Sequence, residues 1–395
     1  MSSELSTHHG LPAACQTVIN RFVAISKNNP QVFCAPARIN LIGEHTDYNL
    51  GFVLPATIDR YIYFAIAKND APFFNIEALD LKEKVSLQEK NEAVPEYLWA
   101  KYFHSMIEVL RAKGHEVPPV ECVFGGNIPI GSGLSSSAAL TCGFIYALNE
   151  IFQWDLSRVE IAQLGQASEH MVGLNCGIMD QYAVLHGRQN EVLQLDCRSL
   201  SHQYFPLDLG DYHLVLFNSM VSHALADSAY NDRRESCERV VQTLQKTYPQ
   251  VQSLRDVNVQ MLEDHQGQIT PLDLQRVLFV LHENERVIKT TEALSSGQLD
   301  QVGQYLYASH EGLSRDYEVS CEELDFLVDQ LKGEPGVLGS RMMGGGFGGC
   351  TINLIHKDYL NEVAKKLTQK YQKVYRKTPE MHVVQTGDGV KKIMP

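Results

Sequence analysis

The sequence predicts a two-domain protein that contains both helices and strands, and three observations support this expectation. The chain has 395 residues, which is more than the size at which a single hydrophobic core usually stops growing. Apolar residues make up 44% of it and charged residues 21%, as is typical of a globular protein. Strand and helix patterns both occur in the first half, whereas residues 231–331 are mainly helical in pattern. We expect one domain over residues 1–205 and a second over residues 206–395.

The first half combines short apolar runs, bounded by turn residues, with longer periodic segments. The short runs predict strands, which we expect at residues 31–35, 51–54, 61–67, 120–124 and 191–195. Apolar residues that recur every three or four positions predict helices, which we expect at residues 11–27, 95–113, 140–152 and 157–172. The glycine- and serine-rich residues 131–137 are expected to form the loop before the third of these helices.

The second half is separated from the first by a turn-rich segment, residues 199–211, near which we place the domain boundary. A strand is expected at residues 212–217, and the long helical part follows it. After a glycine cluster, the pattern predicts a strand at residues 350–356, then a helix, and a last strand near residues 381–385.

The charge and apolar content of the chain exclude several classes of partner. The formal net charge is −13, so we expect neither nucleic-acid binding nor binding to an anionic membrane, since both need a basic surface. The N-terminus lacks the basic start and apolar core of a signal peptide. The longest apolar run, residues 61–67, is too short to span a bilayer. Nine scattered cysteines without a C-x-x-C pair favour reduced thiols, and therefore a cytoplasmic protein.

The segment GSGLSSSAAL, residues 131–140, is the first pattern that indicates a function. Glycines let a backbone approach an anion closely, and serines at the start of a helix add hydroxyl donors beside the positive end of the helix dipole. These features predict a phosphate-binding loop at a helix N-terminus. The segment is not a Walker A loop, because no lysine follows it. The structural alternative is an ordinary serine-capped helix behind a flexible turn.

The segment GGGFGG, residues 344–349, satisfies the G-x-G-x-x-G pattern of dinucleotide-binding folds. The residues that follow it read as a strand rather than a helix, so that interpretation fails. Five glycines in six residues still imply a backbone pressed against a ligand or another backbone. A purely structural turn between two strands is the alternative.

Asp180, in the segment NCGIMDQ, lies among weakly polar neighbours. A carboxylate in such a setting is either a helix cap or a functional group. Arg38, Glu44, His45 and Asp47, in the segment ARINLIGEHTDYNLG, follow an apolar strand pattern and could be its partners or bind a polyhydroxylated ligand. An H-E-x-x-H zinc pattern that begins at residue 282 is interrupted by an arginine, so no zincin site is expected.

Three segments in order, PARINLIGEHTDYN, PIGSGLSSSAAL and GSRMMGGGFGGCT, resemble the three motifs of the GHMP family of small-molecule kinases. The first of them, with CGIMDQ and SAYNDRRESCE, resembles the galactokinase branch, and the resemblance covers nearly the whole chain from residue 33. It implies an α+β architecture of two domains with the active site in the cleft between them. It also implies transfer of the γ-phosphoryl group of ATP, with Mg²⁺, to the anomeric hydroxyl of α-D-galactose.

The resemblance also implies roles for individual residues. Asp180 would be the catalytic base, and Arg38 would stabilise charge on the transferred phosphoryl group. The sugar would be held by Glu44, His45, Thr46, Asp47, Gly177 and Tyr230. The nucleotide would be held by Gly131, Ser132, Gly133, Leu134, Ser135, Ser136 and Ser137, with Trp99 and Tyr102 near the adenine. Mg²⁺ would be bound by Ser137 and Glu169.

The chain departs from the family pattern at three positions. Ala37 replaces a glycine and would be strained if its φ were positive. Ser222 replaces a basic residue of many relatives, and Ser168 replaces the glutamate that binds the metal. Glu169 is the next residue and would point about 100° away on a helix.

Two alternatives to a galactokinase stay open in the sequence. One is a GHMP kinase for a related sugar such as N-acetylgalactosamine or arabinose. The other is a catalytically weak sensor of galactose and ATP. In each case we expect a monomer whose partners are small molecules.

Overall fold

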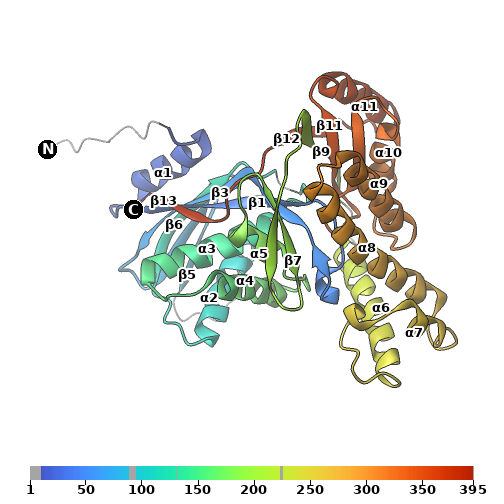
Figure 1. The fold of residues 1–395 in the computed structure, drawn as a ribbon. Coiled ribbons are helices and arrows are strands. Elements are labelled where there is room, and N and C mark those ends of the chain that lie inside the picture. The colour runs from blue at the N-terminus through green and yellow to red at the C-terminus, as the bar shows by residue number, and fades with distance from the viewer. Residues whose placement is uncertain (1–9, 89–94, 130, 223–225, 395) are drawn as a thin grey trace.

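The computed structural model describes residues 10–88, 95–129, 131–222 and 226–394. Figure 1 shows two parts: an N-terminal part built on a large sheet, and a C-terminal part with a smaller sheet and most of the long helices. None of the helices in the described part of the chain has the length and apolar content needed to cross a bilayer.

A six-stranded sheet with the strand order β13-β1-β3-β6-β4-β5 forms the N-terminal part. Its strands are β1 (Gln31–Asn40), β3 (Pro55–Lys68), β4 (Phe73–Ala78), β5 (Glu83–Gln88), β6 (Val120–Gly126) and β13 (Lys391–Met394). Pairing is antiparallel except between β4 and β6. A separate three-stranded sheet contains β2 (Phe52–Val53), β7 (Glu191–Asp196) and β8 (His202–Pro206).

Helices cover both faces of the six-stranded sheet. On one face lie α2 (Leu98–Ala112), α3 (Ser136–Phe152), α4 (Arg158–Val172) and α5 (Met179–His186), and on the other lies α1 (Ala13–Ile25). Because successive side chains of a strand point to opposite faces, Phe33 packs with the larger group of helices and Val32 packs with α1. Figure 1 shows this arrangement.

A four-stranded antiparallel sheet, with the order β10-β11-β9-β12, forms the centre of the C-terminal part. Its strands are β9 (Tyr212–Ser222), β10 (Val337–Met342), β11 (Gly348–His356) and β12 (Glu380–Val384). The helices are α6 (Ala226–Gln245), α7 (Val259–Glu263), α8 (Pro271–Ser295), α9 (Leu299–Arg315), α10 (Glu322–Leu331) and α11 (Leu360–Tyr375). Helices α10 and α11 pack on one face of the sheet through an apolar cluster of their own.

One apolar cluster joins the two parts. It contains Ile39 and Leu41 from β1 and the turn after it, together with Leu216 and Ile352 from the C-terminal sheet. The last strand also crosses between the parts, since β13 returns to pair with β1. The domain boundary near residue 205 stays a prediction.

Most of the elements expected from the sequence are present, but several short strands were missed. β8 lies inside residues 199–211, which we had expected to be turn, and β4, β5, β10 and β13 were not expected. In β4 and β5 only every second side chain is more deeply buried, so their apolar signal is weak. Their pairing depends on neighbours that a local pattern does not contain.

Ala37 is not strained, contrary to the concern raised by the family pattern. It lies within β1 at an irregularity in the pairing with β3, and it is not among the described residues with positive φ. Alanine therefore fits this backbone. The side chain of Ser222, the second departure, lies outside the described residues, although its backbone ends β9.

Candidate active site

A cavity of about 240 Å³ lies where the two parts of the molecule meet. Its wall comes from the turn after β1, the start of α5, one residue of α6, and the glycine segment between β10 and β11. Of the eight residues expected at the catalytic and sugar sites, all but Thr46 line it. The lining residues are Arg38, Glu44, His45, Asp47, Leu174, Cys176, Gly177, Met179, Asp180, Tyr230 and residues 344–347.

Two glycines and a threonine shape the turn after β1, residues 43–51, which we call the signature turn. Gly43 has a φ of 102°, and an added Cβ would lie 2.8 Å from the Phe52 carbonyl oxygen. At Gly51 a Cβ would lie 2.5 Å from Oδ1 of Asn284 in α8. Thr46 is fully buried, and its hydroxyl lies 2.9 Å from the carbonyl oxygen of Gly43 and 2.6 Å from that of Phe52. The Thr46 hydroxyl thus holds the turn and does not line the cavity, and a role of Thr46 in sugar binding stays a prediction.

Arg38 and Asp180 form a two-pronged ion pair at the centre of the cavity wall. Nε and Nη2 of Arg38 donate to the two carboxylate oxygens of Asp180 at 2.7 and 2.8 Å. Nη1 donates to the carbonyl oxygen of Gly133 at 2.8 Å, which joins the pair to the glycine–serine loop. Burial acts to lower the pKa of Arg38, but the Asp180 carboxylate outweighs it and the pKa is raised. The arginine thus stays charged beside a carboxylate that is one-quarter exposed.

Ser135 contributes to this pair instead of capping a helix. It precedes α3 with a φ of 57°, and its side chain makes no capping hydrogen bond. Its hydroxyl donates instead to Oδ2 of Asp180. The alternative of an ordinary serine-capped helix is therefore wrong about Ser135, because its hydroxyl points toward the cavity carboxylate and does not cap the helix.

Two further carboxylates on the cavity wall are buried. Oε1 of Glu44 accepts from the Arg341 guanidinium at 3.0 Å and from the Gly344 amide at 2.8 Å. Asp47 lies against Gly177, where an added Cβ would overlap its carboxylate. Burial, together with the charge of Asp180, raises the pKa of Asp47 to about 7. This carboxylate therefore changes charge within the physiological range.

His45 lines the cavity beside Tyr230, and its ring also packs with Tyr48 and Tyr317 behind the cavity wall. Its ring centroid lies 5.3 Å from that of Tyr230 and 5.0 Å from that of Tyr317. Nδ1 lies 2.9 Å from the hydroxyl oxygen of Tyr48. Burial lowers the pKa of His45 to about 3, so the imidazole is neutral at physiological pH.

The glycine–serine loop opens into a second, more apolar cavity of about 470 Å³. Gly131 and Gly133 have φ values of 71° and 73°, which favour glycine. Ser136 and Ser137 reach the cavity together with Trp99 and Tyr102. Its lining residues are Ile62, Ala78, Asp80, Leu81, Glu83, Tyr97, Leu98, Trp99, Tyr102, Phe124, Gly125, Gly126, Ile128, Ser136, Ser137 and Leu140.

Two side chains of the loop are used for structure rather than for a ligand. Ser132 is buried, and its hydroxyl donates to the carbonyl oxygen of Pro129 at 2.7 Å. Leu134 packs in the apolar cluster that joins the two parts. Of these two residues, only the backbone can face a phosphate group.

Glu169, rather than Ser168, faces the loop. Its carboxylate is buried, lies 2.7 Å from Nε2 of Gln181, and is also contacted by Ser137. Burial raises its pKa to about 7, although the Gln181 and Ser137 hydrogen bonds oppose the shift. Ser168 donates to the carbonyl oxygen of Leu164 within its own helix at 2.8 Å. Glu169 and Ser168 therefore point in different directions, and Glu169, the expected metal ligand, is the one at Ser137; its metal role stays a prediction.

The surroundings of Glu169 suit a hard cation. A carboxylate and a serine hydroxyl are oxygen ligands of the kind that Mg²⁺ prefers, with phosphate oxygens completing its shell. Among the described residues no group of three or more His, Cys, Asp or Glu side chains could hold a metal by itself. A metal here would therefore depend on the nucleotide for most of its ligands.

Arg341 was missed in the sequence analysis, although it lies in a quoted motif. It is fully buried, and besides Glu44 it donates to the carbonyl oxygens of Asn40, Leu41 and Met342. It therefore ties the end of β1 to β10. An arginine in an otherwise apolar strand was the available signal.

The glycine segment between β10 and β11 is pressed against other backbone. An added Cβ at Gly346 would lie 1.9 Å from the carbonyl oxygen of Val319, and one at Gly344 would lie 3.4 Å from that of Gly133. The close approach expected from the sequence is present, and residues 344–346 also line the first cavity.

Three family models match the chain. The galactokinase galactose-binding signature matches residues 20–68. The GHMP kinases N terminal domain matches residues 101–188, and the GHMP kinases C terminal domain matches residues 290–373.

Relatives of known identity match nearly the whole chain. A galactokinase of Thermotoga maritima is 40% identical over 360 residues, which cover 91% of this chain and 99% of the relative. A galactokinase of Clostridium perfringens is 37% identical over 381 residues, which cover 94% and 97%. The crystal structure of Lactococcus lactis galactokinase complexed with galactose superposes with a TM-score of 0.90 at 32% identity, covering 96% of this chain and 99% of that one. Mevalonate kinase of Methanococcus jannaschii shares the fold alone, with a TM-score of 0.63 at 17% identity.

Proposed function

The chain belongs to the galactokinase family of GHMP kinases, and on this basis we propose that the cavity at Asp180 binds galactose while the cavity at Ser137 binds ATP. It is an ATP-dependent sugar kinase with the two-domain α+β architecture of the family. The observation that carries the assignment of sites is the Arg38–Asp180 pair. One guanidinium holds both the carboxylate in the sugar cavity and the carbonyl of Gly133 in the glycine–serine loop.

Asp180 is the general base in this proposal. A sugar hydroxyl is a weak nucleophile, and a positioned carboxylate that takes its proton contributes about 10²–10⁴-fold in rate. The anomeric oxygen forms a bond to the γ-phosphorus of ATP, the bond from that phosphorus to the β–γ bridging oxygen breaks, and the proton passes to Asp180. ADP leaves with the bridging oxygen, and galactose 1-phosphate remains.

Arg38 has two tasks here. It orients the Asp180 carboxylate through two hydrogen bonds, one to each carboxylate oxygen. It also lies where charge develops on the transferred phosphoryl group, so it stabilises the transition state more than the ground state. Ser135, whose hydroxyl donates to Asp180, lies where it can also donate to the sugar or to a phosphate oxygen.

Sugar selectivity would come from the buried polar groups of the first cavity. Glu44 and Asp47 accept hydrogen bonds from sugar hydroxyls, and the ring of Tyr230 packs on the sugar. Gly177 is required because a side chain there would overlap Asp47. An epimer that leaves such buried groups unpaired is rejected strongly.

The nucleotide would lie in the second cavity, with adenine among the aromatic residues near Trp99. Nε1 of Trp99 donates to Glu83 at 2.5 Å, so this indole presents its apolar surface to the base. Mg²⁺, when bound, neutralises phosphate charge. Ser137 and Glu169 are the residues that would hold it.

We also infer that the enzyme acts as a monomer in the cytoplasm. Both proposed sites are complete within one chain, and all nine cysteines are free, which suits a reducing compartment.

The test is ADP release from ATP and Mg²⁺ with galactose, glucose, 2-deoxygalactose, N-acetylgalactosamine and arabinose. Turnover with galactose and little with glucose is expected. If turnover were faster with N-acetylgalactosamine or arabinose than with galactose, that sugar would be the substrate. No turnover with any sugar, while galactose still raises the melting temperature, would make the chain a sensor.

A further inference from the structure

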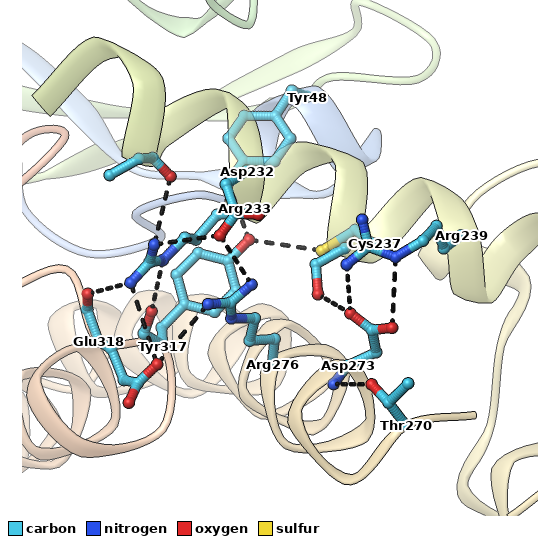
Figure 2. A network of polar contacts seen from close by, with 12 residues as sticks. Tyr48, Asp232, Arg233, Cys237, Arg239, Thr270, Asp273, Arg276, Tyr317 and Glu318 are labelled. Atoms are coloured by element: carbon cyan, nitrogen blue, oxygen red, sulfur yellow. Dashed lines mark hydrogen bonds and ion pairs between the residues drawn. The ribbon is translucent and has the colours of Figure 1, made fainter. Parts of the chain in front are cut away.

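A line of hydrogen-bonding side chains runs from the sugar cavity into the C-terminal part. Nδ1 of His45 lies 2.9 Å from the Tyr48 hydroxyl, and this hydroxyl lies 2.8 Å from that of Tyr317. The Tyr317 hydroxyl in turn lies 3.4 Å from Sγ of Cys237 in α6. Figure 2 shows Tyr48, Tyr317 and Cys237 in this order. His45, Tyr317 and Cys237 are buried, whereas Tyr48 between them is partly exposed.

The position of Tyr317 is fixed by charged groups around it. Nε of Arg233 donates to the Tyr317 carbonyl oxygen at 3.2 Å, and Nη2 donates to that of Glu318 at 2.6 Å. Arg276 lies within ion-pair distance of Asp232 and Glu318, and Figure 2 shows these groups around the tyrosine backbone. The Tyr317 ring also packs on Phe279 with a centroid distance of 4.8 Å. Tyr317 is therefore held in place through both its backbone and its ring.

The direction of the protons along the line follows from the chemistry of its members. Burial keeps both phenols protonated by raising their pKa values, and it raises the pKa of the Cys237 thiol to about 11. A phenol is a better donor than a neutral imidazole, and an imidazole nitrogen is a better acceptor than a phenol oxygen or a thiol sulfur. The most favourable order is therefore Cys237 to Tyr317, Tyr317 to Tyr48, and Tyr48 to Nδ1 of His45.

We propose that Tyr48 and Tyr317 are positioning residues that hold His45 as the neutral tautomer protonated on Nε2. The ring then offers the cavity an N–H donor instead of a second acceptor. Within the described part of the chain, Nε2 is buried and has no hydrogen-bond partner.

The consequence for the sugar rests on the proposed function of the cavity. Glu44 and Asp47 act as acceptors when ionised, so a sugar oxygen near them must donate its proton. A donor at His45 can then satisfy the lone pair of a hydroxyl that has already donated to a carboxylate. Only a hydroxyl in the right orientation meets both groups, and this orientation differs between epimers. The tyrosines would thus contribute to sugar selectivity without touching the sugar.

The tautomer can be measured directly, by ¹⁵N NMR of protein labelled on histidine, in the absence of sugar and nucleotide. The variant His45→Gln identifies the His45 signals by their loss. In the unmodified protein the shifts of a single Nε2-protonated tautomer are expected. The variant Tyr48→Phe should move both ring signals toward the values of a mixture of tautomers, and Tyr317→Phe should produce a smaller change in the same direction.

Steady-state kinetics with galactose and its monodeoxy derivatives give the second measurement. Loss of the Tyr48 hydroxyl should raise the KM for galactose about 5- to 10-fold, the effect of one lost hydrogen bond, and leave the KM for ATP unchanged. One deoxy sugar lacks the hydroxyl that His45 would bind. The loss in kcat/KM of this sugar relative to galactose should be smaller in Tyr48→Phe than in the unmodified enzyme. A general loosening of the fold would affect all sugars alike.

Tyr307→Phe is the matched control, because this tyrosine hydroxyl donates to the Leu331 carbonyl in the same part of the molecule. It should leave the His45 signals and the galactose KM unchanged. The proposal is overturned if His45 is protonated on Nδ1 in the unmodified protein, or if both Tyr48→Phe and Tyr317→Phe leave its signals unchanged. Because the NMR measurement needs no turnover, a failure of the galactokinase assignment would be seen separately, in the ADP assay.

Discussion

Single residues at the site show how burial and neighbouring charge divide the carboxylates into different roles. Asp180 is partly exposed and forms an ion pair with Arg38, so it remains accessible to a ligand in the cavity. Asp47 and Glu169 are buried, and their pKa values are raised to about 7. Glu44 is buried but held by a guanidinium and an amide. These different surroundings suit the different roles proposed for the carboxylates, as base, sugar ligand and metal ligand.

At Asp180, replacement by asparagine should separate binding from catalysis. Asn keeps the shape of the side chain but does not take a proton, so kcat should fall by at least about 10²-fold. Galactose affinity, measured by calorimetry, should change far less. Turnover close to that of the unmodified enzyme would remove Asp180 as the base.

The raised pKa of Asp47 predicts a pH dependence of sugar use. The ionised carboxylate binds hydroxyl donors, so kcat/KM for galactose should rise as pH increases through about 7 and then level off.

The stability of the folded protein should change with pH in the opposite sense, because of the same carboxyl group. The folded protein holds this proton from the ordinary pKa of 3.8 up to about 7, so the melting temperature of the sugar-free protein should fall as pH rises through that window. The variant Asp47→Asn should lessen the fall, and an equal fall in the variant would contradict the assignment.

Glu169 and Ser168 form a matched pair for the metal. Glu169→Gln should raise the Mg²⁺ concentration needed for half-maximal activity by at least about tenfold, as is usual when groups at a metal site are lost. Ser168→Ala is the control and should leave the Mg²⁺ curve unchanged, because its hydroxyl bonds only within α4. If activity depended on the Mg²⁺ concentration in the same way in both variants, the metal would bind elsewhere.

At the scale of elements, glycine-rich segments determine how the strands and loops come together. In the segment between β10 and β11, a side chain at Gly346 would overlap the Val319 carbonyl oxygen, and a Cβ at Gly344 would touch the carbonyl oxygen of Gly133 in the glycine–serine loop. The turn after β1 is limited in the same way at Gly43 and Gly51. These contacts bring together three segments that are far apart in the sequence.

Gly346→Ala tests this packing. The new Cβ would lie 1.9 Å from the carbonyl oxygen of Val319 at a φ of +85°, so we expect a loss of more than about 2 kcal/mol in the free energy of unfolding. Gly114→Ala has a similar φ, +89°, and no heavy atom within 4 Å. It should lose only the about 1–2 kcal/mol of a strained residue. Urea unfolding compares them, and equal losses would mean that the close contact contributes nothing.

At the scale of the whole molecule, the cavity proposed to bind the sugar is built from both parts. Asp180 and the signature turn belong to the N-terminal part, whereas Tyr230 and the glycine segment belong to the C-terminal part. Helix α8 of the C-terminal part supports the turn directly, through Glu283, which accepts from the Gly43 amide at 3.0 Å, and through Asn284, which accepts from the Phe52 amide at 2.7 Å. Sugar binding should therefore stabilise both parts together.

Calorimetry can test this coupling. Galactose at 100 times its dissociation constant should add about 2.7 kcal/mol to the stability and shift a single unfolding transition to higher temperature. Two transitions, of which only one moves with galactose, would show that one part binds the sugar alone.

Local patterns in the sequence determined the main helices and strands, the glycine–serine loop and the signature turn. Each of these depends on residues close together in the chain, through apolar periodicity, glycine conformations and polar clusters. The family resemblance further placed Arg38, Asp180, Glu44, His45 and Asp47 at one site, and the structure brings them together.

Only the tertiary structure decided what depends on partners distant in the chain. It showed that Thr46 holds a turn, that Glu169 rather than Ser168 faces Ser137, and that Tyr317 reaches the signature through Tyr48. It also revealed short strands such as β13, whose partner β1 is at the other end of the sequence. The direction of a side chain and the pairing of a short strand are set by packing, because the local free-energy differences between the alternatives are small compared with burial and hydrogen bonding in the folded protein.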